Sequence, residues 1–306
     1  MKVLVATEKP FAAVAVDGIK KVVEDAGMTL ILLEKYATRD QLLKAVEDVD
    51  ALIVRSDIVD AQVLDAAKNL KIVVRAGAGY DNIDLKAATA HGVVVENTPG
   101  QNSNAVAELV FGMTVMAARN MFNGTSGCEL KDKKLGIHAF GQVGRNVARI
   151  AKGFGMEVSA LDPYCPDSAM EEAGVKPLHD IKKLYAENDV VSLHIPATEE
   201  TRGSVGYDLV TLLPKGGILV NTARKEVIDE EGLKRALEDR PDIKYVADIK
   251  PGNAVELSEK FADRVFFTPK KMGAQTAEAN FNAGVAAAEQ VIAFLRDGWN
   301  KYQVNK

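Results

Sequence analysis

The stretch from Lys134 to Tyr164, KLGIHAFGQVGRNVARIAKGFGMEVSALDPY, constrains the fold of this chain more than any other stretch. An apolar run leads into a turn that contains Gly141 and Gly144, and an amphipathic helical pattern follows. A second apolar run then ends in Asp162. This order of strand, glycine turn, helix and acid-tipped strand is typical of a βαβ unit that binds a dinucleotide, as in the Rossmann fold.

Each position of the turn has a physical role in phosphate binding. Gly141 lies where the backbone must approach a pyrophosphate, Gly144 lets the helix pack closely on the first strand, and the helix N-terminus offers unpaired N–H groups. Ala139 stands where the pattern normally has a further glycine, so we expect it to keep a negative φ, which a methyl group allows. Asp162 is expected to bond both ribose hydroxyls of NAD and to repel the 2′-phosphate of NADP, because no arginine follows it in residues 163–165. The alternative is an ordinary βαβ unit without a ligand.

Composition narrows the class of protein. A chain of 306 residues is long enough for two domains. The net charge of -5 and the pI near 5.6 give no sign of nucleic-acid or membrane-surface binding. The two cysteines, Cys128 and Cys165, cannot build a disulfide framework, which indicates a reducing compartment. We find no signal peptide and no apolar run long enough to span a bilayer, so we expect a cytoplasmic protein without a membrane partner.

Strand and helix signals alternate along the chain, which predicts an α/β protein with parallel sheets covered by helices on both faces. The expected strands are 3–6, 30–33, 51–54, 72–74, 93–95, 135–139, 156–161, 189–194, 218–220, 245–247 and 265–267. The expected helices are 14–26, 39–46, 61–67, 105–119 and 277–294. Helix 105–119 is apolar on most of its faces, so we expect it to be buried between domains or in a subunit contact.

Two arginines follow expected strands. Arg55 and Arg75 stand at strand ends beside turn residues, and ligands of such sheets bind beyond the carboxyl ends of the strands. An anion site and two solvated surface charges are both consistent with this placement.

Several blocks of the sequence together resemble one family, the D-2-hydroxyacid dehydrogenases, across essentially the whole chain. The blocks are VRSD (54–57), RAGAGYDNID (75–84), ENTPGQN (96–102), VAELVFG (106–112), the glycine turn, SLHIPATEET (192–201), GGILVNTARKEVIDEEGL (216–233) and MGAQTAEA (272–279). Within the family, the chain looks most like a short D-3-phosphoglycerate dehydrogenase. From its length we do not expect it to hold the C-terminal regulatory domain that these enzymes often carry.

The resemblance implies two doubly wound, Rossmann- or flavodoxin-like domains with the active site in the cleft between them. We expect a substrate-binding domain of residues 1–100 plus 281–306, to which the last helix returns, and an NAD-binding domain of residues 101–280. The implied activity is the NAD-dependent oxidation of D-3-phosphoglycerate to 3-phosphohydroxypyruvate, the first step of L-serine biosynthesis. A homodimer through the NAD-binding domain is also implied.

The resemblance further assigns site residues by motif. Arg224 would hold the substrate carboxylate and polarise the keto oxygen, since a guanidinium meets a carboxylate in bidentate geometry. Asp248 would receive the nicotinamide carboxamide, or else simply cap its strand end. The substrate-binding residues are Arg55, Ser56, Arg75, Ala78, Gly79 and Asn102. The cofactor-binding residues are Gly141, Gln142, Val143, Gly144, Asp162, Pro163, His194, Pro196, Thr201, Thr222, Ala223, Asp248 and Gly273, and no metal ligands are expected.

The sequence departs from the family where the catalytic Glu and His are expected. No histidine follows His194. Alignment from Gly273 places Lys271 at the His position, whereas alignment from Pro269 places Lys270 there; the anchor from Gly273 is longer, so we favour Lys271. The segment expected to hold the Glu is shortened and carries Lys250.

These losses leave two interpretations open. One is a dehydrogenase without activity that senses NAD or binds a partner, as the related C-terminal-binding corepressors do. The other is an enzyme that uses a lysine as acid/base. The absence of both the Glu and the His favours this second interpretation. A carboxylate raises the pKa of a neighbouring base, whereas a lysine must be brought from about 10.4 towards 7–8 to be efficient. A glyoxylate or hydroxypyruvate reductase is the alternative within the family.

Overall fold

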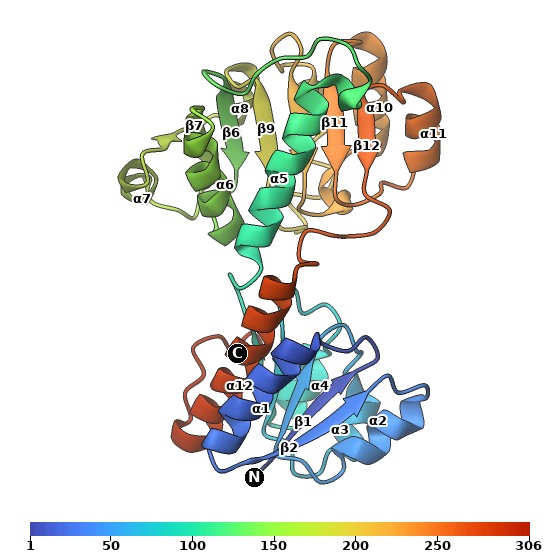
Figure 1. Ribbon diagram of the computed structural model, residues 1–306, viewed down its shortest axis with the longest axis vertical. Coiled ribbons are helices and arrows are strands. Elements are labelled where there is room, and N and C mark those ends of the chain that lie inside the picture. The colour runs from blue at the N-terminus through green and yellow to red at the C-terminus, as the bar shows by residue number, and fades with distance from the viewer. The chain divides into compact units, whose positions relative to one another are not determined.

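The computed structural model describes residues 1–306, and the chain divides into two compact units. The first unit comprises Met1–Asn102 and Gln275–Lys306, and the second comprises Ser103–Ala274. Each unit contains one parallel sheet, of five strands in the first and seven in the second (Figure 1). The predicted α/β class with two parallel sheets is therefore confirmed. The chain returns to the first unit just before its last helix, because that whole helix packs within the first unit.

The first unit has the strand order β2-β1-β3-β4-β5, and every neighbouring pair is parallel. Its strands are β1 Lys2–Thr7, β2 Thr29–Glu34, β3 Ala51–Val54, β4 Ile72–Arg75 and β5 Val94–Asn97. Its helices are α1 Ala13–Asp25, α2 Arg39–Val46, α3 Ala61–Ala66, α4 Leu85–Ala90 and α12 Ala277–Asp297. Side chains alternate along β1: Val3 and Val5 pack towards α1 and α12, whereas Leu4 and Ala6 pack towards α2, α3 and α4.

The second unit has the strand order β12-β11-β10-β9-β6-β7-β8, again parallel throughout. Its strands are β6 Lys134–His138, β7 Glu157–Leu161, β8 Lys176–Pro177, β9 Val190–Leu193, β10 Ile218–Asn221, β11 Lys244–Ala247 and β12 Val265–Phe267. Its helices are α5 Ser103–Ala118, α6 Gln142–Gly153, α7 Asp167–Glu172, α8 Ile181–Ala186, α9 Tyr207–Val210, α10 Glu230–Asp239 and α11 Ala254–Lys260, with short turns η1 Asn120–Phe122 and η2 Lys225–Val227. The order of strands reverses between β6 and β9, which is where sheets of this type bind ligands.

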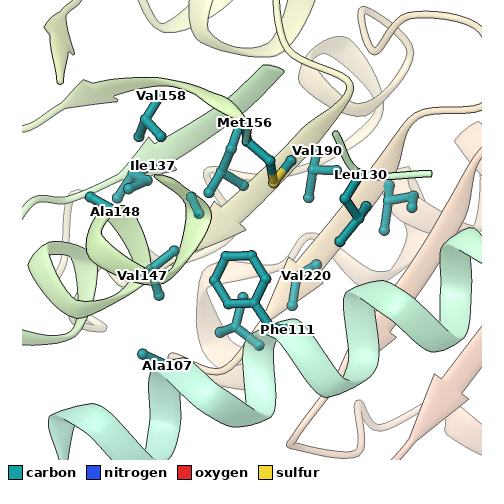
Figure 2. Close-up of a cluster of buried hydrophobic side chains, with 14 of the residues drawn as sticks. Ala107, Phe111, Leu130, Ile137, Val147, Ala148, Met156, Val158, Val190 and Val220 are labelled. Carbon is teal, nitrogen blue, oxygen red and sulfur yellow. The ribbon is translucent and has the colours of Figure 1, made fainter. Parts of the chain in front are cut away.

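Helix α5 is largely buried within its own unit. It lies against α6 and the seven-stranded sheet of that unit. Figure 2 shows Phe111 of α5 pointing towards Val147 of α6 and Val220 of β10. Most apolar side chains of α5 therefore belong to the core of the second unit, because α5 packs on both α6 and the sheet.

No helix of the protein combines the length and the apolar composition that crossing a membrane requires.

Candidate active site

The turn after β6 differs from the expectation in one respect. Ala139 has φ of +82°, so it does not keep the negative φ that we expected. Its N–H donates to the carbonyl oxygen of Leu161 at 2.9 Å, which extends the pairing with β7 beyond the end of β6. The chain must then turn sharply into α6, and this turn imposes the left-handed conformation whether or not the residue is glycine. A methyl group is tolerated there at an energetic cost, because L-residues disfavour this region by roughly 1–2 kcal/mol.

Replacing Ala139 with glycine should therefore stabilise the protein by about 0.5–1 kcal/mol, because relief of the backbone strain exceeds the added entropy of the unfolded chain. Thermal or urea unfolding measures this change. Ala160→Gly is a matched control, since Ala160 lies buried within β7 and should lose stability on the same substitution. A less stable Ala139→Gly protein would show that the left-handed turn carries no strain.

The two glycines of the turn serve different purposes. A Cβ on Gly144 would lie 2.4 Å from the carbonyl oxygen of Ala139, so this glycine is required by the packing of α6 on β6. Gly141 has φ of -74°, and a Cβ there would meet no atom of the chain within 4 Å. Neither conformation nor packing thus requires glycine at 141. The open space lies at the N-terminus of α6, which has no side-chain cap and no acidic residue in its first turn, and it fits a phosphate group.

Asp162 fastens the turn to the end of β7. Its Oδ2 accepts a hydrogen bond from the N–H of Phe140 at 2.8 Å, and its Oδ1 accepts one from Tyr164, also at 2.8 Å. A carboxylate has about four acceptor positions, so each oxygen keeps capacity for a ribose hydroxyl. The same carboxylate can shape the phosphate turn and contact a sugar.

The sequence analysis missed Arg145, in the first turn of α6, whose guanidinium reaches the loop after β7. Its guanidinium lies over the ring of Phe140, 4.9 Å from the ring centre, and Nη2 donates to Sγ of Cys165 at 3.3 Å. No arginine stands in residues 163–165, but the fold brings one to Cys165 from α6. Such a cation can meet a 2′-phosphate once the neighbouring carboxylate is gone.

Replacing Asp162 with alanine should weaken NADH binding by about 10- to 100-fold, since hydrogen bonds to a charged group contribute about 1.5–3 kcal/mol. NADPH should be affected less, because repulsion of its 2′-phosphate is removed and Arg145 remains. Fluorescence titration with both nucleotides measures the two dissociation constants. Asp167→Ala, an exposed acid in the first turn of α7, is the control. An unchanged ratio of the two constants would refute the ribose assignment.

Two half-buried histidines lie at the point where the strand order reverses. The N–H of His194 donates to the carbonyl oxygen of His138 at 2.9 Å, and Nε2 of His194 lies 2.9 Å from Oγ of Ser192. Burial lowers the pKa of His138 to about 4 and that of His194 to about 3. Both imidazoles are therefore neutral near pH 7 and add no positive charge at this edge of the sheet.

The end of β10 presents Arg224. Asn221 shapes this turn: its Oδ1 accepts from the N–H of Ala223 at 2.9 Å, and its Nδ2 donates to the carbonyl oxygen of Arg224 at 3.0 Å. The half-buried guanidinium of Arg224 donates from Nη1 to the Ala223 carbonyl at 3.0 Å and pairs with no carboxylate. The hydroxyl of Thr222 is buried without a hydrogen-bond partner. This strand end therefore offers a cation and an unpaired hydroxyl to a ligand.

Asp248, at the end of β11, is 1% exposed and binds the loop that follows β12. Its Oδ1 accepts from the hydroxyl of Thr268 at 2.9 Å and from the N–H of Met272 at 2.7 Å. Its Oδ2 accepts from the N–H of Gly273 at 2.7 Å. Oδ2 has one acceptor position left, and the expected hydrogen bond from a nicotinamide carboxamide would have to use it.

The lysines that the sequence analysis aligned with the family's His and Glu positions lie on two separate loops of the second unit. Lys270 and Lys271 are exposed on the loop after β12, and Lys250 is exposed on the loop after β11. Glu230, which the sequence analysis did not single out, fixes the second of these loops. Its two oxygens accept from the N–H groups of Gly252 at 2.6 Å and Asn253 at 3.1 Å.

In the first unit, Arg55 leaves the end of β3 and donates only to neutral oxygens. Nη1 donates to the carbonyls of Lys9 at 3.2 Å and Pro10 at 3.1 Å, and Nη2 donates to Oδ1 of Asn280. Burial lowers the pKa of Arg55, and the charge of Asp57 opposes this effect. A half-buried guanidinium with no paired carboxylate favours binding of an anion.

Arg75, at the end of the adjacent strand β4, packs over a glycine turn. Its Nε donates to the carbonyl oxygen of Arg55 at 2.9 Å. Gly77 has φ of +145°, and a Cβ there would lie 1.4 Å from Nη1 of Arg75, so only glycine fits. The N–H groups of Ala78 and Gly79 donate no hydrogen bond within the chain, which leaves them available to a carboxylate.

A buried acid that we did not predict holds the loops at this edge together. Asp57, 5% exposed, accepts hydrogen bonds from the N–H of Glu8 at 2.7 Å and from the hydroxyl of Tyr36 at 2.8 Å. Burial, together with this hydrogen bond, raises the pKa of Tyr36. The VRSD block contained the signal, because an acid directly after a strand end often caps neighbouring loops.

The remaining predicted residues lie at the same two edges. Ser56, Gln142, Pro163 and Pro196 are exposed, whereas Asn102, Val143 and Thr201 are half-buried. The hydroxyl of Thr201 donates to the carbonyl oxygen of Pro196, so this residue closes its own loop.

Comparison with known proteins adds independent information. Residues 7–305 match the family model for the D-isomer specific 2-hydroxyacid dehydrogenase catalytic domain. The chain is 36% identical over 291 residues to D-3-phosphoglycerate dehydrogenase of Methanocaldococcus jannaschii, covering 90% of this chain but only 55% of that relative. It is 35% identical over 284 residues to hydroxypyruvate reductase of Thermotoga maritima, covering 87% of this chain and 91% of that protein.

A solved structure of similar length also resembles this chain in fold and in sequence. The crystal structure of NAD⁺-bound 3-phosphoglycerate dehydrogenase from Entamoeba histolytica superposes with a TM-score of 0.89 and 46% identity, covering 100% of this chain and 99% of that one.

Proposed function

Because this chain belongs to the family of D-isomer specific 2-hydroxyacid dehydrogenases, we propose that it oxidises D-3-phosphoglycerate to 3-phosphohydroxypyruvate with NAD, the first step of L-serine biosynthesis. One observation carries the choice of a phosphorylated substrate. Two arginines, Arg55 and Arg75, end adjacent strands of the first unit, and the Arg55 guanidinium is paired with no carboxylate. The resemblance to phosphoglycerate dehydrogenases assigns both residues to the substrate phosphate.

The groups that suit NAD binding all lie in the second unit. The open space at Gly141, the uncapped N-terminus of α6, the carboxylate of Asp162 and the unpaired hydroxyl of Thr222 all suit a dinucleotide. When bound, NAD would supply the acceptor for the hydride that leaves C2 of the hydroxy acid.

The proposed chemistry needs one cation and one proton acceptor from the protein. Arg224 would hold the substrate carboxylate in bidentate geometry, with the N–H groups of Ala78 and Gly79 on its other edge. Lys271, entering the step as a neutral amine, would take the proton of the C2 hydroxyl. As the hydride leaves C2, Nζ of Lys271 would receive the O–H proton, and the remaining oxygen would form the C2=O double bond of the product.

Three substrates tested in parallel decide between the candidate functions. We expect fast NADH oxidation with phosphohydroxypyruvate and slower oxidation with hydroxypyruvate and glyoxylate. The reverse order would identify a hydroxypyruvate or glyoxylate reductase, which the similarity to hydroxypyruvate reductase of Thermotoga maritima favours as the alternative. NADH binding without activity on any of the three would identify a non-catalytic interaction protein. We also propose a homodimer through the second unit, which light scattering tests.

A further inference from the structure

The closing segment, residues 299–305 after α12, covers one edge of the five-stranded sheet. The strand order places β5 at that edge, and Gln303 forms an antiparallel bridge with Glu96 of β5. The N–H of Val304 donates to the carbonyl oxygen of Val95 at 2.9 Å. An edge strand that would otherwise present unpaired N–H and C=O groups is thus covered by the chain itself.

Asn305, 7% exposed, anchors the closing segment. Its Oδ1 accepts from the N–H of Val95 at 2.9 Å. Its Nδ2 donates to the carbonyl oxygen of Val93 at 2.8 Å and to the hydroxyl of Thr89, in α4, at 3.1 Å. The segment is therefore held on β5 by specific hydrogen bonds.

Glu96 contacts the closing segment as a buried acid with an incomplete set of partners. It is 0% exposed, its Oε1 accepts from the N–H of Tyr302 at 3.0 Å, and its Oε2 has no hydrogen-bond partner. Burial raises the pKa of Glu96 above its ordinary value of 4.5, and the Tyr302 N–H opposes the rise. The neutral carboxyl group is therefore the form that suits this site.

We propose that Glu96 makes the closing segment a pH-operated clamp: the segment stays on β5 while the acid is neutral and detaches when the acid ionises. A buried carboxylate with one donor and no cation is costly, whereas detachment lets water reach both oxygens and takes the proton into solvent. Because the docked state holds the proton more tightly, docking is strongest below the ordinary pKa and weakens as the pH rises through the raised pKa.

The charged groups near Glu96 do not explain such a pH dependence. Glu96 alternates with Val95 along β5, so it points to the face of the sheet that α12 covers. The charged residues of α12 near its C-terminal half, Glu289, Arg296 and Asp297, are exposed. Side chains of the other types keep one charge state between about pH 5 and pH 9, and β4, α12 and the closing segment contribute Val74, Arg75, Gln290, Lys301 and Tyr302.

His91, directly after α4, is the group that must be separated from Glu96. It stands two residues after Thr89, which binds Asn305, and it titrates in the same pH range. Hydrogen bonds to the carbonyl oxygen of Ala87 and to Asp65 raise its pKa. A substitution of His91 therefore serves as the control.

The clamped strand leads into the turn that we propose for the substrate carboxylate. Directly after Glu96, Nδ2 of Asn97 donates to the carbonyl oxygen of Ala78 at 2.6 Å. The N–H of Thr98 donates to the carbonyl oxygen of Gly77 at 3.0 Å. Detachment would loosen this support, so the KM for phosphohydroxypyruvate should rise with pH more in the wild type than in Glu96→Gln. This consequence rests on the proposed function, whereas detachment itself does not.

The chain contains its own probe for the test. Trp299, the only tryptophan, lies in the closing segment and packs edge-on against Tyr302, with the ring centres 5.5 Å apart. Acrylamide quenching of its fluorescence should increase in the wild-type protein between about pH 5 and pH 9. Protection of residues 299–306 against amide exchange, relative to the intrinsic rate at each pH, should fall by up to about tenfold per pH unit.

Three variants separate the possible causes. Glu96→Gln stays neutral and its oxygen can still accept from Tyr302, so quenching and protection should keep their low-pH values throughout. Asn305→Ala removes the anchor and should show strong quenching at every pH. His91→Gln should retain the pH dependence of the wild type. Thermal unfolding of each variant establishes that it is folded.

Two outcomes would overturn the clamp. In one, quenching and protection in the wild type do not change over this pH range. In the other, Glu96→Gln keeps the wild-type pH dependence, or His91→Gln abolishes it. An equal rise of KM with pH in the wild type and Glu96→Gln would refute the link to the substrate turn. Quenching and exchange need neither substrate nor cofactor, so an inactive wild-type protein would refute the proposed function but not the clamp.

Discussion

Replacing Lys271 with alanine is expected to lower kcat for D-3-phosphoglycerate by about 100- to 10,000-fold, which is the usual contribution of a general acid/base. The Kd for NADH should remain within about 3-fold of the wild-type value, because the cofactor contacts proposed above lie at other strand ends. Stopped-flow turnover and fluorescence titration of NADH measure the two quantities separately.

Substitution of Lys270 tests whether Lys271 or its neighbour is the acid/base. Lys270→Ala changes the same exposed loop and removes the same charge, so it is the matched control and should retain most of the activity. Wild-type-like turnover in the Lys271→Ala protein would instead assign the role to Lys270 or exclude lysine chemistry.

A second substitution separates proton transfer from charge. Lys271→Arg keeps a cation, but a guanidinium does not lose its proton near neutral pH. We expect this variant to be about as slow as Lys271→Ala. Recovery of turnover in Lys271→Arg would show that a positive charge, rather than a proton acceptor, is what the site requires.

Continuous apolar runs predicted the sheets well. Strands 51–54 and 265–267 and helix 39–46 have the same bounds in the structure as in the sequence analysis. Their ends are clear because each run changes to polar residues abruptly. Helices α4 and α8 were missed, since each is only 6 residues long and shows little periodicity. An aspartate caps each of them, Asp84 and Asp180, and was the available signal.

The features that escaped prediction depend on contacts distant in sequence. Motif spacing placed Asp248 at a strand end but could not show that its carboxylate binds the backbone at Met272 and Gly273. Arg145 reaches Cys165 only because α6 packs beside the end of β7. Likewise, the positive φ of Ala139 follows from the path of the chain and not from the residue type. Sequence patterns give the identity of site residues, whereas their hydrogen-bond partners require the fold.

Replacing Arg55 with alanine is expected to separate a phosphorylated substrate from an unphosphorylated one. A hydrogen bond to a charged group contributes about 1.5–3 kcal/mol, so kcat/KM for phosphohydroxypyruvate should fall about 10- to 150-fold. For hydroxypyruvate, which lacks the phosphate, the change should stay below about 3-fold. The measurement is the ratio of the two kcat/KM values. A loss of folded protein lowers both values by the same factor and so leaves the ratio unchanged.

The control for this prediction comes from the contacts of Arg55 itself. Its guanidinium also bonds the carbonyls of Lys9 and Pro10 and the side chain of Asn280, so truncation disturbs the local structure. Asn280→Ala removes one of these contacts but keeps the cation, and it should affect both substrates equally. Arg55→Lys should recover part of the preference, because a point charge attracts a phosphate without bidentate geometry. Equal losses for both substrates in Arg55→Ala would assign Arg55 a structural role and favour a hydroxypyruvate or glyoxylate reductase.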